Sequence, residues 1–200
     1  AAGDLLLAVT NVETLRTRHL VEAQALLGDS VEYDDIVAEI SVGFDELAHL
    51  AEAFSTLGFV TPRSLDAVAA IGEVLSSQMV AAAFRHRGVP AEWVDARMVM
   101  ITDDHFTRAA PNVNAIAAAA REHIRPVVAQ GKVPVLGGFI GSTTGNVTTT
   151  LGRGGSDFSA ALFGAALEAE AIEIWTDVDG MLTADPRVVP TARLIDRIRF

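Results

Sequence analysis

The sequence contains no cysteine and a single lysine, and each scarcity narrows the chemistry that it can support. Without cysteine, disulfides, thiol nucleophiles and cysteine-ligated metals are excluded. The one lysine, Lys132, leaves arginine as the main cation that could neutralise an anionic ligand. Long apolar runs are also missing, because none approaches the ~20 residues that span a bilayer. The first residues do not form a basic-then-apolar leader, and we therefore expect a cytoplasmic protein with no membrane partner.

Basic residues are outnumbered, with 15 Lys and Arg against 26 Asp and Glu, a net charge of −11 and a pI near 4.8. Such a surface does not suit nucleic acid, because phosphate backbones need a basic face. A single phosphate pocket is still compatible with this charge, since it depends on local groups. Half of the residues are hydrophobic, which supports a substantial core in one large domain or two small ones.

The most informative stretch is residues 151–161, LGRGGSDFSAA, which an apolar, alanine-rich run continues to residue 167. Its polar positions and glycines are Gly152, Arg153, Gly154, Gly155, Ser156 and Asp157. This order predicts a glycine turn that leads into the N-terminus of a helix, where unpaired N–H groups attract an anion. Arg153 adds a fork suited to a carboxylate or phosphate. The alternative for these residues alone is an ordinary glycine-rich turn with a serine cap.

Apolar spacing predicts helices over most of the N-terminal half and alternating elements after it. We expect helices over residues 4–27, 31–57, 64–71, 73–87, 113–130 and 156–167. We expect strands within 91–102, as two short ones around Asp95-Ala96, and over 133–141 and 171–175, with a polar loop at 142–150. Strands that alternate with helices indicate parallel pairing. The predicted fold class is therefore α/β, with helices covering a mainly parallel sheet and a largely helical N-terminal half.

Gly72 and Glu73 interrupt an apolar helical pattern, and both are unfavourable there. Glycine costs about 1 kcal/mol relative to alanine inside a helix, and a buried carboxylate costs more unless it is paired. One interpretation is a junction between two helices, with Glu73 favouring the second N-terminus. The other is that Glu73 points into a ligand site and recognises an ammonium group.

Two acidic groups could be interpreted as metal sites. They are Asp34, Asp35, Glu39, Asp45 and Glu46 in the second helix, and Asp103, Asp104 and His105 after the strands. A solvated helix face and a polar loop explain them better, because no turn focuses the first group and no second cluster accompanies the other. We therefore predict no metal site built by protein ligands alone.

Five segments together resemble the aspartate kinases, which are members of the amino acid kinase superfamily. They are IGEVLSS (71–77), WVDAR (93–97), GFIG (138–141), TTTLGRGGSDFSAALFGAAL (148–167) and EIWTDVDGMLTADPRVVP (173–190). The resemblance covers roughly residues 60–200. It implies a three-layer α/β/α sandwich and ATP-dependent phosphorylation of the L-aspartate side chain with Mg²⁺, at the start of lysine, threonine and methionine biosynthesis. It also implies a homodimer.

The same resemblance implies roles for matching residues. Arg153 grips the substrate α-carboxylate and Glu73 meets its ammonium, while Phe139 and Ser156 shape the aspartate pocket. Gly154, Gly155 and Asp157 act at the transferring phosphoryl group. The residues expected along the nucleotide are Thr176, Asp177, Asp179 and Arg187.

Some family features are not matched. No KFGGTS-like strand with its catalytic lysine is found, the C-terminal nucleotide-binding lysine region and the ACT regulatory domains are missing, and Leu182 stands where many members have tyrosine. We therefore expect residues 1–200 to be one partial catalytic domain, inactive or nearly so when separated from its parent. Two alternatives remain open, a sister kinase acting on another acid and a non-catalytic nucleotide-binding module.

Overall fold

The computed structural model describes residues 5–176 and 180–197. Its contacts divide the chain into two compact units, Ala1–Glu170 and Ala171–Phe200, which are described separately. The prediction of a single catalytic domain across residues 1–200 stays a prediction.

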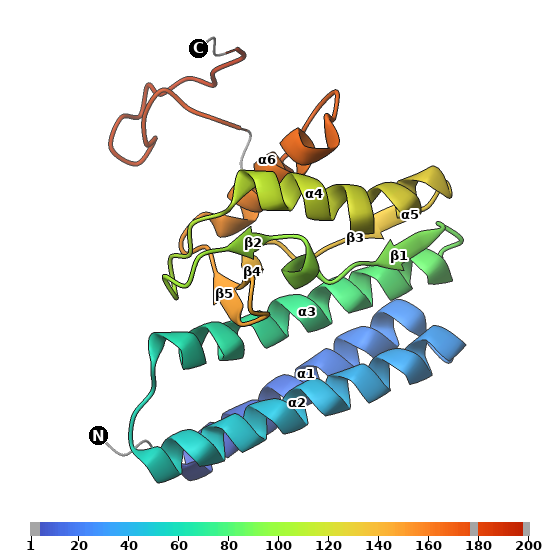
Figure 1. Cartoon of the computed structure of the whole chain (residues 1–200), viewed down its shortest axis with the longest axis vertical. Helices are drawn as coiled ribbons and strands as arrows, with labels where there is room; N and C mark the ends of the chain where they lie inside the picture. The colour runs from blue at the N-terminus through green and yellow to red at the C-terminus, as the bar shows by residue number, and fades with distance from the viewer. Residues whose placement is uncertain (1–4, 177–179, 198–200) are drawn as a thin grey trace. The chain divides into compact units, whose positions relative to one another are not determined.

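Three long helices begin the first unit: α1 (Leu5–Leu27), α2 (Val31–Leu57) and α3 (Pro62–His86). The first two expected helices are confirmed at these bounds. Ser30 and Thr61 cap α2 and α3, because their hydroxyl oxygens accept backbone N–H groups three residues later at 3.2 and 3.1 Å. In Figure 1, α3 lies between the α1–α2 pair and the strands, and the contacts of these elements agree.

Helix α3 runs through Gly72 without a break, so the expected junction there is wrong. The apolar residues Ile71, Leu75 and Met79 are buried against α1 and α2, and this packing outweighs the roughly 1 kcal/mol that a helical glycine costs. By length and composition alone, α3 could cross a membrane. Its most apolar 18-residue stretch has a mean hydropathy of 1.5, and 44% of that stretch is buried inside the structure.

Five short strands follow: β1 (Ala91–Trp93), β2 (Ile101–Thr102), β3 (Val133–Val135), β4 (Ile140–Thr143) and β5 (Thr148–Thr150). The pairs β1–β3 and β2–β4 are parallel, whereas β4–β5 is antiparallel. The strands form two sheets, β1–β3 and β2–β4–β5, so the mainly parallel pairing is confirmed but is divided between them. The two short strands within 91–102 are also confirmed, with the 3₁₀ turn η1 (Ala96–Met98) between them. At the end of β1, Trp93 Nε1 donates to Ser77 Oγ on α3 at 2.9 Å.

The expected strand over 133–141 is two strands, because the chain bends between β3 and β4. The expected polar loop at 142–150 is also wrong, since its ends form the β4–β5 hairpin. Threonines occupy β5, and β-branched side chains favour extended structure. Polar composition alone therefore did not mark a loop.

Helices α4 (Val113–His123), α5 (Arg125–Ala129) and α6 (Gly155–Leu167) lie on the other face of the strands from α3 (Figure 1). A buried cluster from α4, α5 and the strand region packs against the apolar residues of α6. The three-layer α/β/α arrangement is confirmed. The single helix expected over 113–130 is interrupted at Ile124, because proline at 126 restricts the residue before it and lacks an N–H.

The second unit has no helix or strand among its described residues, 171–176 and 180–197. The strand predicted over 171–175 is wrong there. Ile172 and Ile174 are about half exposed and Trp175 is 90% exposed. A β-rich sequence forms a strand only when a neighbour offers its backbone and covers its side chains. Downstream, Leu182 and Leu194 form an isolated antiparallel bridge, and the Ile195 N–H donates to Met181 O at 2.8 Å.

Candidate active site

An open cavity of about 590 Å³ lies in the first unit, where α3, β5 and the start of α6 meet. Its lining includes all seven residues that were predicted to bind the substrate or to act in catalysis: Glu73, Phe139, Arg153, Gly154, Gly155, Ser156 and Asp157. Leu65, Asp66, Ala69, Thr107, Thr150 and Gly152 complete it. Residues up to 92 positions apart in sequence, Leu65 and Asp157, therefore share one site.

The glycine turn and the helix after it form as the sequence predicts. Gly154 caps α6 in the left-handed region, at φ 78° and ψ 10°, which only glycine adopts readily. Gly155 is required for space, because a Cβ there would lie 2.9 Å from Phe139 Cδ2 and 3.0 Å from Leu151 Cβ. Among the described residues, no side chain caps the helix. The Gly155 N–H donates to the Gly152 carbonyl at 3.0 Å and the Phe158 N–H to the Gly154 carbonyl at 3.2 Å. The N–H groups of Ser156 and Asp157, between them, can therefore face an anion in the cavity.

Two opposite charges line this cavity on different elements. Arg153 is exposed in the turn, and no carboxylate within residues 5–176 and 180–197 pairs with it. Glu73 is half-buried on α3, and desolvation raises the pKa of its carboxyl. A group that carries both an ammonium and a carboxylate would satisfy both side chains.

Phe139 has a backbone φ of 69°, which is uncommon for a residue with a side chain. Hydrogen bonds hold both of its backbone groups. Its N–H donates to Ser159 Oγ at 2.9 Å, and its carbonyl accepts the Leu151 N–H at 2.9 Å. Ser159 in turn donates to the Gly155 carbonyl at 2.7 Å. The aromatic ring is thereby fixed beside the turn that carries Arg153.

The loop between β3 and β4 reaches both walls of the cavity through two glycines. A Cβ on Gly137 would lie 3.2 Å from the Glu73 carbonyl oxygen, and one on Gly138 would lie 3.0 Å from Ser156 Cα. This close approach brings α3 and α6 onto the same short segment. The distance between Glu73 and the glycine turn therefore depends on the absence of side chains at Gly137 and Gly138.

Asp66 is the main cavity residue that the sequence did not reveal. Its side chain is 1% exposed, and its oxygens accept hydrogen bonds from Thr107 and Thr150. These partners lie 41 and 84 positions away in the chain. The local signal was only one acidic residue within an expected helix, which is ordinary on a solvated face.

The residues predicted along the nucleotide belong to the second unit or lie outside the described residues. Thr176 and Arg187 are described, whereas Asp177 and Asp179 are not. Arg187 contacts Asp185 with Nε and Nη2 at 3.1 and 2.8 Å, and this hydrogen bonding lowers the pKa of Asp185. Their roles at a nucleotide stay predictions.

The loop of Asp103 and His105 has a structural explanation. Asp103 accepts the Ala110 N–H at 2.8 Å and the His105 N–H at 3.1 Å, and these bonds lower its pKa, with the Ala110 bond contributing most. The carboxylate therefore closes a turn. Among the described residues, no group of three or more His, Asp or Glu could hold a metal ion.

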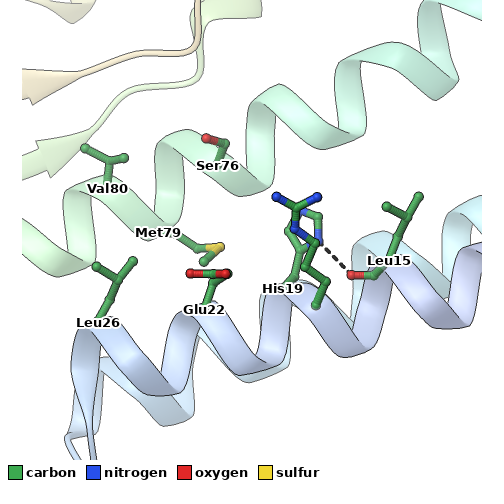
Figure 2. Close-up of a pocket in the computed structure, with 8 residues that line it drawn as sticks. Leu15, His19, Glu22, Leu26, Ser76, Met79 and Val80 are labelled. Atoms are coloured by element: carbon green, nitrogen blue, oxygen red, sulfur yellow. Dashed lines mark hydrogen bonds between the residues drawn. The ribbon is translucent and has the colours of Figure 1, made fainter.

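A second cavity of about 270 Å³ lies between α1 and α3. Figure 2 shows His19 and Glu22 from α1 opposite Ser76 and Met79 from α3. The His19 ring nitrogen is hydrogen-bonded to the Leu15 carbonyl at 2.8 Å. No helix N-terminus lines this cavity, so it is less suited to binding an anion than the first cavity is.

Comparison with known proteins gives a consistent result. The model of the amino acid kinase family matches residues 8–200. Lysine-sensitive aspartokinase 3 of Escherichia coli is 41% identical over 173 residues, which cover 86% of this chain and 38% of the relative. The aspartokinase of Schizosaccharomyces pombe is 36% identical over 188 residues, which cover 94% of this chain and 36% of the relative.

Among solved structures, E. coli aspartokinase III in complex with aspartate and ADP, in its R-state, is similar with a TM-score of 0.83 and 39% identity. The match covers 92% of this chain and 40% of that one. The chain thus spans about two fifths of the length of these relatives.

Proposed function

The chain belongs to the amino acid kinase family, and from this premise we propose that it is the catalytic part of an aspartate kinase. ATP phosphorylates the side-chain carboxylate of L-aspartate, and the products are 4-phospho-L-aspartate and ADP. This reaction begins the biosynthesis of lysine, threonine and methionine. We also propose that the protein is cytoplasmic, and that it acts as a homodimer, as the family resemblance implies.

One observation carries the proposal: Glu73 and Arg153, 80 positions apart in the chain, line the same cavity. The Glu73 carboxylate binds the substrate ammonium, and the Arg153 guanidinium binds the α-carboxylate. Desolvation raises the pKa of Glu73 in the free protein, and a bound ammonium offsets this effect by favouring the charged form. Phe139 and Ser156 bound the remaining space around the substrate side chain.

The transfer itself requires positioning and charge neutralisation more than a protein nucleophile. An oxygen of the aspartate side chain attacks the γ-phosphorus of ATP, and a new phosphorus–oxygen bond forms. The bond between the γ-phosphorus and the bridging oxygen breaks, and ADP leaves with its electron pair. The N-terminus of α6 offers the backbone N–H groups of Gly154, Ser156 and Asp157 to the charge that develops on the phosphoryl oxygens. Gly155 shapes this turn, because its own N–H donates to the Gly152 carbonyl at 3.0 Å.

Asp157 fits a role in holding the magnesium that accompanies ATP. Mg²⁺ binds through one or two carboxylates together with substrate phosphates and water, and Asp157 is an exposed carboxylate in the cavity lining. The ion supplies charge neutralisation to the phosphate oxygens when it is bound. Thr176, Asp177, Asp179 and Arg187 are proposed to contact the nucleotide.

The test is an assay of ADP release by the protein at its natural length, with aspartate, glutamate, acetylglutamate, carbamate or UMP as acceptor. We expect release with aspartate, together with a product that hydroxylamine converts to a hydroxamate, as an acyl phosphate requires. Release with another acceptor but not with aspartate would identify a sister kinase. ATP binding without turnover on any acceptor would identify a non-catalytic module.

A further inference from the structure

The carboxylate of Asp66 is buried beneath the cavity and connects three separate segments. Thr107 N–H lies 3.1 and 2.9 Å from its two oxygens, Thr150 N–H donates at 3.0 Å, and Thr150 Oγ1 donates at 2.7 Å. Asp66 itself belongs to α3, Thr150 ends β5, and Thr107 lies in the loop after β2. No cation within residues 5–176 and 180–197 forms an ion pair with Asp66. Neutral donors therefore balance its charge.

The position of Asp66 relates it to both charges of the proposed substrate site. Glu73 is seven residues further along the uninterrupted helix α3, which places it on the same face about 10 Å away along the axis. Arg153 follows Thr150 by three residues. Two helical turns on one side and a short glycine turn on the other thus separate Asp66 from the two charged side chains.

A second contact strengthens the connection to the turn. The Thr107 carbonyl oxygen would lie 3.0 Å from a Cβ on Gly152, so the loop that Asp66 holds also packs against the residue before Arg153. Asp66 therefore restrains the glycine turn from β5 and from the loop after β2.

We propose that Asp66 is a positioning residue that fixes the spacing between Glu73 and Arg153, and hence the orientation of the bound amino acid. This inference rests on the proposed function. Asp66 acts through Thr150 and Thr107, whose donors occupy both of its carboxylate oxygens. Orientation determines whether the substrate carboxylate reaches the γ-phosphorus, so Asp66 contributes to the choice between aspartate and a longer acid.

The test substitutes Asp66→Asn in the protein at its natural length and measures kcat and KM for aspartate, glutamate and ATP. Asparagine keeps the shape but places an NH₂ group against N–H donors. We expect the KM for aspartate to rise about tenfold or more, the preference for aspartate over glutamate to fall, and the KM for ATP to stay within about threefold. Removing a negative charge would by itself strengthen anion binding, so a simple electrostatic role predicts the opposite sign.

Thr149→Val is the matched control. Thr149 is the neighbouring residue on β5, is fully buried and shares a 2.7 Å hydroxyl hydrogen bond with Thr102, but it does not bond α3. We expect this variant to lose some stability and to keep both KM values. KM does not depend on the fraction of folded enzyme, so it separates positioning from general destabilisation.

A second route remains if Asp66→Asn does not fold. Thr150→Val removes one donor to Asp66, whereas Thr150→Ser keeps it, so only the valine variant is expected to raise the KM for aspartate. When Asp66→Asn does fold, its combination with Thr150→Val should be no worse than Asp66→Asn alone, because both act through one contact.

The inference is overturned if Asp66→Asn keeps the KM for aspartate, if both KM values rise equally, or if Thr149→Val has the same effect. It is also overturned if Thr150→Val and Thr150→Ser behave alike. Failure of the proposed function is distinct, because the unsubstituted protein would then release no ADP with aspartate.

Discussion

The backbone around Arg153 is held by contacts with segments that are distant in the sequence. Around Arg187, by contrast, the described contacts come from residues of the same short turn. The glycine turn contacts the loop after β2, the β3–β4 loop and Phe139, and buried Asp66 supports it from α3. In the second unit, the Arg187 guanidinium donates its hydrogen bonds to the carboxylate of Asp185, two residues earlier.

This difference indicates which of the two arginine segments is ordered before a ligand binds. A backbone segment held by long-range contacts, such as the turn of Arg153, is already in place when a ligand arrives, so interaction energy is not spent on ordering that segment. A segment held only by its own turn loses more freedom on binding, and the net contribution of its side chain is smaller. The contrast predicts large effects of substitutions in the glycine turn and small effects at Arg187.

The largest effect is expected for Arg153→Ala. Loss of a charged, forked donor to the α-carboxylate should lower kcat/KM for aspartate by roughly 10²–10³-fold, because hydrogen bonds to charged groups contribute about 1.5–3 kcal/mol each. The measurement is aspartate-dependent ADP release, with circular dichroism as the folding control. Arg153→Lys should recover only part of the activity, since lysine lacks the planar fork. Full activity in either variant would remove Arg153 from the substrate site.

Gly155→Ala should rank next, because a Cβ there would press on Phe139 and Leu151. We expect a loss of about 1–3 kcal/mol in the free energy of unfolding, as overpacking of a tight site costs, together with weaker aspartate binding. Urea denaturation and the KM for aspartate measure the two effects. Gly145→Ala is the matched control, since its Cβ would meet only Thr143 Oγ1 at 3.7 Å. Equal effects at the two positions would contradict the tight packing of the turn.

Glu73→Gln should raise the KM for aspartate about tenfold. The same substitution should increase stability at neutral pH. The raised pKa means that the stability contributed by Glu73 is fully present below the unfolded pKa, about 4.3, and is lost as pH rises through the folded value. The glutamine variant avoids this loss. Its melting temperature should therefore exceed that of the unsubstituted protein slightly at neutral pH and match it near pH 4. The reverse pH trend would refute burial as the cause.

Arg187→Ala should have the smallest effect, a rise in the KM for ATP of about threefold or less, because an exposed pair within one turn contributes little. The KM for aspartate should not change. Asp185→Ala is the companion variant, since it frees the guanidinium without removing it. A loss in ATP affinity as large as the loss that Arg153→Ala causes for aspartate would erase the contrast between the two regions.

Local signals explain what the sequence predicted correctly. The glycines and the alanine-rich run place a turn and helix α6 within one residue of the observed start, because both depend on neighbours in the chain. The helices α1 and α2 follow from apolar spacing and from the capping residue Ser30 in the same way. The residues themselves indicated Arg153 as an anion ligand and left two interpretations of Glu73 open. The resemblance assigned both to one substrate, since no periodicity shows that they share a cavity.

Long-range contacts explain what the sequence did not reveal. Asp66 is satisfied by backbone groups of distant segments, and nothing near it in the chain distinguishes it from a surface acid. Phe139 adopts a positive φ only because Ser159 and Leu151 hold its backbone. The helix break predicted at Gly72 is wrong, because a local stretch of sequence does not show how α3 packs against α1 and α2. Residues 171–175 have strand composition without a described partner strand.

The two tryptophans offer a separate optical probe of each unit. Trp93 is hydrogen-bonded to Ser77 in the first unit, while Trp175 is almost fully exposed in the second. A soluble quencher should therefore extinguish the red-shifted emission of Trp175 first and leave a bluer, protected component from Trp93. Replacing either indole with phenylalanine would give a single-emitter protein, in which fluorescence during denaturation follows one unit without interference from the other.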